Sequence, residues 1–98
     1  MAAEQKLKDM GLELGPVGTP VANYLPAVQT GNLLYVAGHI AGMPDGSVLN
    51  PGKVGRDVTE EQAYKSAKLA MLNCLASIKL TLGDLDKVKR VVKLLVMV

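Results

Sequence analysis

The chain has little of several residue types: no Trp, no Phe, one Cys and one His among 98 residues. One Cys excludes a disulfide scaffold and fits a reducing compartment, and one Cys with one His cannot supply the three or four ligands of a zinc site. No run approaches the ~18 apolar residues of a membrane span, and the N-terminus lacks the apolar core of a signal peptide. The net charge of +2 is too small to indicate a nucleic-acid or membrane partner by itself. We therefore expect a cytoplasmic protein without a bound metal.

Apolar residues make up 49% and charged residues 20% of the chain, which is typical of a globular domain, and the length allows one domain, residues 1–98. A short helix is expected over residues 3–10, before Gly11. A hairpin is expected over residues 22–40, because strand candidates flank Thr30-Gly31-Asn32. Gly and Asn tolerate the positive φ that tight hairpin turns need. Pro26 cannot donate to a ladder, so the first strand should be an edge or bulged there.

The strongest pattern predicts a helix over residues 60–82. Thr59 and Gln62 have the spacing of a capping box, and Gly83 is a typical stop. At 100° per residue, the predicted core face collects Ala63, Ala67, Met71, Cys74, Ile78 and Leu82. A second apolar face contains Leu69, Leu72, Ala76 and Leu80. Leucines are costly to leave in water, so that second face predicts a further partner surface, either another helix or another subunit.

The last segment, residues 88–98, is rich in β-branched residues and ends in Leu94-Leu95-Val96-Met97-Val98. This composition predicts an inner strand that is covered on both faces at its far end. A terminal carboxylate in such a place would be expensive to bury. We therefore expect a fold that is incomplete as encoded here, or that another chain completes.

Few side chains offer chemistry, and the residues alone leave the function open. His39 follows Gly38 at the end of a predicted strand, where it could exchange protons near neutral pH; the alternative, which the residues favour, is a loop histidine facing water. Tyr24 stands beside Pro26, so its hydroxyl either faces a cleft or packs. Cys74 lies among apolar helix positions and is expected to be a small buried side chain rather than a nucleophile.

The most basic stretch contains Lys87, Lys89, Arg90 and Lys93. Alternation along a strand sends Lys89 and Lys93 to one face and Arg90 to the other, and without Phe or Trp there is no stacking platform for bases. A solvated strand end is the expected interpretation, and a nucleic-acid patch is the alternative. The sequence shows no Gly-rich phosphate loop and no Ser/His/Asp constellation.

Residues 23–40, NYLPAVQTGNLLYVAGHI, resemble the opening hairpin of the YjgF/RidA (endoribonuclease L-PSP) family. That hairpin has a Tyr, a run of small residues and valine, a Gly-Asn turn, and a strand ending in Ser-Gly-Gln or similar. The helix over 59–82 and the following GDLDKVKRVVK look like the family's first long helix and the strand after it. The resemblance covers roughly residues 22–98.

The resemblance implies an α+β, chorismate-mutase-like fold with a mixed sheet packed against helices on one face, assembled as a homotrimer with clefts between subunits. In the best-understood members each cleft hydrolyses reactive enamines and imines to a 2-oxo acid and ammonia, without metal or organic cofactor. The implied ligand is a small imine or enamine that bears a carboxylate. The alternatives within the family are an RNA-cleaving translation inhibitor and a trimer that binds small ligands without turnover.

Carried over by position, Tyr24 matches the family's cleft tyrosine, and Ala37 and Gly38 match the strand end whose backbone lines the cleft. His39 stands where the family usually has Gln. The family's carboxylate-binding Arg and the acidic residue of its last strand fall beyond Val98, as do its second helix and final strand. The resemblance therefore implies either a chain truncated at its C-terminus or a divergent protein without that catalysis.

Overall fold

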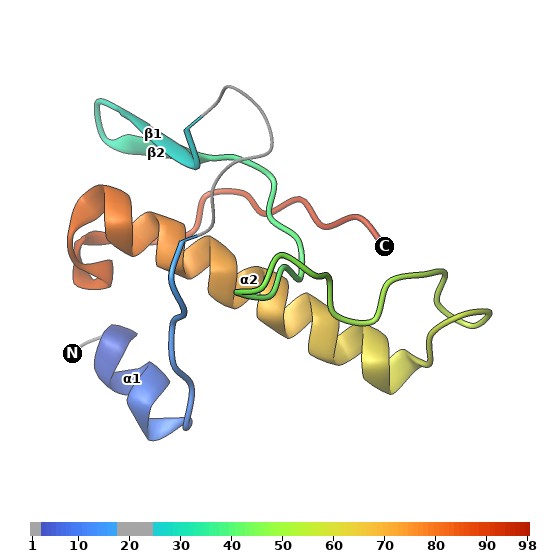
Figure 1. Ribbon diagram of the computed structural model, residues 1–98. Helices are drawn as coiled ribbons and strands as arrows, with labels where there is room; N and C mark the ends of the chain where they lie inside the picture. Colours follow the sequence, from blue (N-terminus) through green and yellow to red (C-terminus); the bar gives the residue numbers. More distant parts are fainter. Residues whose placement is uncertain (1–2, 18–24) are drawn as a thin grey trace.

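The computed structural model describes residues 3–17 and 25–98 of the chain. In chain order the elements are helix α1 (Ala3–Asp9), strands β1 (Ala27–Thr30) and β2 (Leu33–Val36), helix α2 (Glu60–Leu82) and the 3-10 helix η1 (Leu85–Lys87). Helix α2 runs through the middle of the molecule, with the hairpin beside its C-terminal half and α1 near its C-terminal end (Figure 1). The predicted α+β class is confirmed, and the sheet of the described residues has two strands.

The hairpin is antiparallel and has a two-residue turn. Ala27 pairs with Val36 and Thr30 with Leu33. Gly31 has a φ of 60° and Asn32 has no positive φ, the pattern of a type II′ turn, which suits the twist of a hairpin. The amide of Ala37 donates to the carbonyl of Pro26 over 2.9 Å, and this is the last rung of the ladder. The strands are shorter than the hairpin predicted over 22–40, of which residues 22–24 lie outside the described residues.

Helix α2 has the predicted bounds because its end signals are local. The amide of Gln62 donates to the Thr59 hydroxyl over 3.1 Å, and the amide of Thr59 donates to the Gln62 side chain over 2.9 Å. This reciprocal pair is the predicted capping box. At the other end Gly83 adopts a left-handed φ of 88° and donates to the carbonyl of Lys79.

The face of α2 that packs inward is not the one predicted. Ala67 and Met71, assigned to the core face, are exposed, whereas Ala76 and Ser77 are the buried residues of the helix. Leu80, on the second apolar face, is 64% exposed. The residues after β2 contact this buried face of α2 through hydrogen bonds from Ser66, Asn73 and Ser77, a tertiary contact that the apolar periodicity of the helix does not indicate.

Helix α1 attaches to the C-terminal end of α2 through polar contacts. The Glu4 carboxylate pairs with Lys79 at 2.6 Å and accepts from the amide of Leu85 over 3.4 Å. The amide of Ala3 donates to the Asp86 carboxylate over 2.8 Å. Leu85, only 3% exposed, is the most buried apolar residue of the described chain.

The inner strand predicted over residues 88–98 is wrong for the structure of the single chain. The segment leaves η1 without forming a helix or strand, and its apolar side chains face outward, with Met97 86% exposed. A strand exists only as part of a ladder with a neighbour, and no other segment of the described chain pairs with this one.

None of the described helices is long and apolar enough to cross a membrane.

Candidate functional site

The predicted site residues Ala37, Gly38 and His39 follow β2 directly. Ala37 and His39 are partly buried, whereas Gly38 is exposed. A Cβ built on Gly38 would meet no described atom within 4 Å, so the backbone is open to an approaching molecule at this point. Tyr24, the predicted catalytic residue, lies outside the described residues, and its role stays a prediction.

The residues alone favoured a loop histidine that faces water, but His39 is partly buried and both ring nitrogens have partners in the chain. Its Nδ1 lies 2.7 Å from the carbonyl oxygen of Ala37. Its Nε2 lies 2.7 Å from the hydroxyl oxygen of Ser77, which is in the C-terminal half of α2. One imidazole ring therefore joins the end of β2 to the long helix, across 38 residues of sequence.

Two further polar side chains of α2 hold the loop that follows His39. The Asn73 amide donates to the carbonyls of Ile40 and Gly42, both over 3.0 Å. The Ser66 hydroxyl donates to the carbonyl of Leu49 over 2.8 Å. Positions 66, 73 and 77 are seven and four residues apart, so they share one face of a helix. We call Ser66, Asn73 and Ser77 the polar seam.

Sequence reasoning missed the polar seam. The available signal was three hydrogen-bonding residues at helical spacing, Ser66, Asn73 and Ser77. Ser and Asn side chains are mostly exposed in proteins. Here Ser66 and Asn73 bind backbone carbonyls and Ser77 binds the His39 ring, and none of these distant partners can be inferred from the residue pattern of the helix.

Cys74 is half-buried, and this burial raises the pKa of its thiol. A raised pKa disfavours the thiolate, which agrees with the expectation that Cys74 is a packing residue rather than a nucleophile. In the described ranges no three His, Cys, Asp or Glu side chains come together as metal ligands.

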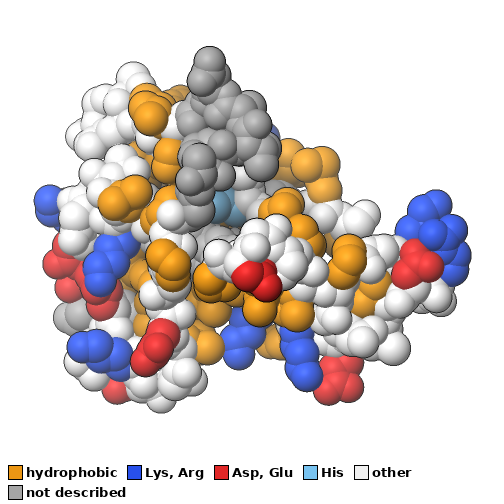
Figure 2. Space-filling view, viewed as in Figure 1, with side chains coloured by type: hydrophobic (Ala, Val, Ile, Leu, Met, Phe, Trp, Pro, Cys, Tyr) orange, Lys and Arg blue, Asp and Glu red, His pale blue; other side chains and the backbone are white. Residues whose placement is uncertain are grey.

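The basic side chains after α2 are exposed. Lys87 donates from Nζ to the carbonyl of Leu82 over 2.8 Å and so satisfies the end of α2. Lys89, Arg90 and Lys93 lie on the exposed segment that leaves η1. Figure 2 shows hydrophobic side chains spread over the middle of one face of the molecule, with charged ones mainly toward its rim.

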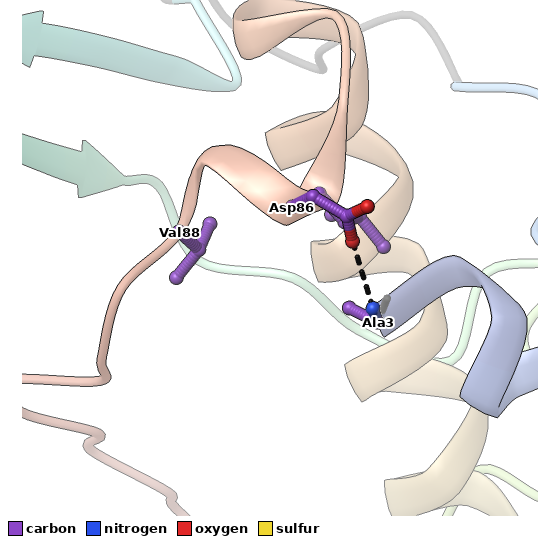
Figure 3. A pocket seen from close by; sticks show the side chains of 4 residues that line it. Ala3, Asp86 and Val88 are labelled. Atoms are coloured by element: carbon purple, nitrogen blue, oxygen red, sulfur yellow. Dashed lines mark hydrogen bonds between the residues drawn. The ribbon is translucent and has the colours of Figure 1, made fainter. Parts of the chain in front are cut away.

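The surface of residues 3–17 and 25–98 includes two shallow hollows that are not lined by a predicted site residue. One, of about 290 Å³, is lined by Ala3, Leu85, Asp86 and Val88, and the hydrogen bond from Ala3 to Asp86 crosses it (Figure 3). The other, of about 360 Å³, lies beside α1 and is lined by Lys8, Gly11, Leu12 and Glu13. The strand end at Gly38 is instead an open edge, which suits a site completed by a second surface.

Residues 4–98 match the model of the family described as YjgF/chorismate mutase-like, putative endoribonuclease. The chain belongs to this family.

Three relatives illustrate the match. Protein TCP17 of Trypanosoma cruzi is 34% identical over 92 residues, which are 94% of this chain and 57% of that protein. The crystal structure of a putative endoribonuclease from Shewanella oneidensis MR-1 matches with a TM-score of 0.85 and 32% identity, over 92% of this chain and 59% of that one. The structure of Atu1372 from Agrobacterium tumefaciens matches with a TM-score of 0.75 and 42% identity, over 90% and 53%. The chain thus spans a little more than half the length of these relatives.

Proposed function

We propose that the chain forms one wall of a cleft that hydrolyses small imines and enamines bearing a carboxylate, with release of a 2-oxo acid and ammonia. The observation that carries the proposal is the strand end at Ala37-Gly38-His39. Its backbone is open at Gly38 and anchored on both sides, by the last rung of the hairpin and by the His39 ring. An exposed yet fixed backbone is what a pre-organised binding wall requires.

The reaction needs little from the protein beyond orientation. Water attacks the electrophilic iminium carbon, the π electrons of the C=N bond move to nitrogen, and the added water loses a proton, which gives a neutral carbinolamine. The carbinolamine nitrogen takes up a proton, and the C–N bond then breaks with release of ammonia as the hydroxyl loses its proton and forms the C=O bond. Positioning the substrate and the water is therefore the main contribution of the cleft. Tyr24 is proposed to place the water or substrate, and the backbone at Gly38 to lie against the ligand.

A carboxylate ligand calls for a guanidinium partner. Arg56 is already bound to Asp57 at 2.9 Å, and Arg90 lies on the exposed segment after η1. We therefore place the carboxylate contact on the surface that faces Gly38 in the assembled protein. The proposed assembly is a homotrimer with its clefts between subunits, which the exposed Tyr35, Ile40 and Val92 support, because large apolar side chains favour burial against a partner.

The test is ammonia release from freshly generated 2-iminopropanoate, measured for this chain and for the longest reading frame that contains it. Gly38→Val should lower kcat/KM at least about tenfold, because the added side chain fills the space for the ligand. Gly15→Val is the matched control, since Gly15 also has open space at its Cβ and no positive φ, and it lies outside the loop that Asn73 holds; it should keep most of the activity. If the longer protein is inert toward imines, the proposal is wrong.

RNA cleavage is the second candidate, and two observations favour it. The family model and the S. oneidensis relative are both described as putative endoribonucleases, and Lys89, Arg90 and Lys93 are exposed together. Binding to a single-stranded RNA should weaken steeply as salt rises, and Lys89→Gln with Lys93→Gln should reduce that slope by about one to two. Tyr24→Phe should matter less for RNA than for imines. An RNA affinity that changes neither with salt concentration nor on replacement of Lys89 and Lys93 would exclude this function.

A further inference from the structure

We infer that His39 is a positioning residue: its ring, held as the Nδ1–H tautomer between the Ala37 carbonyl and the Ser77 hydroxyl, sets the backbone orientation of Gly38. The structural part of this inference stands by itself. Its consequence for catalysis rests on the proposed function, because it concerns the same strand end.

The tautomer follows from the two contacts of the ring. A backbone carbonyl can only accept a hydrogen bond, and the Ala37 oxygen lies 2.7 Å from Nδ1, so Nδ1 must hold the hydrogen. In the neutral ring Nε2 is then an acceptor, and the Ser77 hydroxyl, 2.7 Å away, must donate to it. The opposite tautomer would place two lone pairs against each other at the Ala37 contact.

The burial of Ser77 decides what this pair can do. A serine hydroxyl that donates to a histidine nitrogen has the arrangement of a nucleophile and its base. Ser77, however, is only 1% exposed, and a substrate cannot reach its oxygen. The hydroxyl therefore serves as a fixed internal partner for the ring, and the histidine acts on the site through the backbone it holds.

Gly38 is the residue that this arrangement constrains. Glycine has the widest choice of backbone angles. Gly38 lies in the chain between Ala37, whose carbonyl oxygen binds the ring, and His39, which carries the ring. Closing that short loop onto α2 removes most of the freedom of the Gly38 peptide. The Asn73 contacts to Ile40 and Gly42 hold the chain immediately beyond it and restrict the Gly38 backbone further.

The first measurement is the tautomer itself, read from long-range 1H–15N couplings of the imidazole at a pH where the ring is neutral. His39 is the only histidine, so its signals need no assignment. The expected result is the Nδ1–H form, although a free neutral histidine prefers Nε2–H. An Nε2–H ring in the folded protein would overturn the inference, and this measurement needs no variant.

The second measurement compares Ser77→Ala with Ser66→Ala, a control from the same polar seam whose hydroxyl binds the Leu49 carbonyl instead. Ser77→Ala should shift the ring toward a mixture of tautomers and lower the order parameter of the Gly38 amide, whereas Ser66→Ala should change neither. An unchanged tautomer and an unchanged Gly38 amide in a folded Ser77→Ala protein would also overturn the inference.

The catalytic consequence is measured last, as ammonia release by the longest reading frame that contains the chain. Ser77→Ala should lower kcat by about tenfold to a hundredfold with a smaller change in KM, because misplacing a cleft wall mainly disturbs the reacting geometry. His39→Gln, whose side-chain oxygen can still accept from Ser77, should restore part of the kcat relative to His39→Ala. An inert wild-type protein with an Nδ1–H ring would refute the proposed function alone. A normal kcat in Ser77→Ala would refute the positioning role alone.

Discussion

Replacing Asn73 by Asp is the sharpest test of the polar seam. The Asn73 amide donates to two backbone carbonyls, those of Ile40 and Gly42, both over 3.0 Å. Aspartate has nearly the same shape but no N–H, so Asn73→Asp removes both hydrogen bonds and turns a carboxylate oxygen toward two carbonyl oxygens. Asparagine and aspartate have similar helix propensities, so that difference does not obscure the result.

The expected loss of stability follows from these two bonds. Each intramolecular hydrogen bond contributes about 0.5–1.5 kcal/mol net, so losing two should cost about 1–3 kcal/mol. In a domain of this size each kcal/mol lowers Tm by about 4–8 °C, so a fall of at least about 4 °C is expected. Repulsion between the new carboxylate and the carbonyls adds to this loss.

The measurement is thermal unfolding followed by circular dichroism at pH 7 and at pH 4. A protonated carboxyl can donate one hydrogen bond to a carbonyl, so folding favours the neutral form of the new Asp and raises its pKa above the unfolded value. The deficit relative to wild type is therefore largest above that raised pKa and shrinks as the pH falls through it. The control compares Ala67→Asp with Ala67→Asn at an exposed position of α2, where the two should differ by less than about 0.5 kcal/mol. A Tm for Asn73→Asp within about 2 °C of wild type at pH 7 would contradict the reasoning.

Three further predictions concern local structure. Thr59→Ala should cost about 0.5–2 kcal/mol in the free energy of unfolding, measured by urea titration, whereas Thr59→Ser should cost little because it keeps the capping hydroxyl. Gly52→Ala should destabilise the chain more than Gly55→Ala in the same titration, because both residues have a positive φ but only at Gly52 would the new Cβ lie 2.5 Å from the Asp57 Cβ; equal losses would contradict this. The hydrogen bond from Arg56 lowers the pKa of Asp57. Its contribution to stability is therefore present above the unfolded pKa and is lost as the pH falls through the lower, folded pKa, so Asp57→Asn should flatten the decline of Tm at pH values below the unfolded pKa of about 3.8.

The elements that could be predicted from the sequence are those with local causes. The bounds of α2 depend on Thr59, Gln62 and Gly83, which act within one turn of the chain, and the hairpin turn depends on Gly31. The family resemblance, carried by the order of these motifs, was confirmed by the match over residues 4–98.

The elements that could not be predicted depend on contacts between distant residues. His39 meets Ser77 across 38 positions, and nothing in either neighbourhood indicates the other. The packed face of α2 carries hydrogen bonds to distant residues, which its apolar periodicity does not indicate. Residues 88–98 have strand composition, but a strand requires a neighbour, and composition does not supply one. The assignment of Tyr24 to the cleft stays a prediction.

The attachment of α1 determines the order in which the molecule opens. The helix has seven residues, none of them buried, and a helix this short is not stable by itself in water. It exists because Glu4 and Ala3 meet Lys79 and Asp86, more than seventy positions away in the chain, so it forms only after α2 and η1 are in place. In hydrogen exchange, the amides of α1 should therefore be among the least protected, while those in the middle of α2 report global unfolding. We therefore expect the N-terminal helix to detach before the rest of the described chain unfolds.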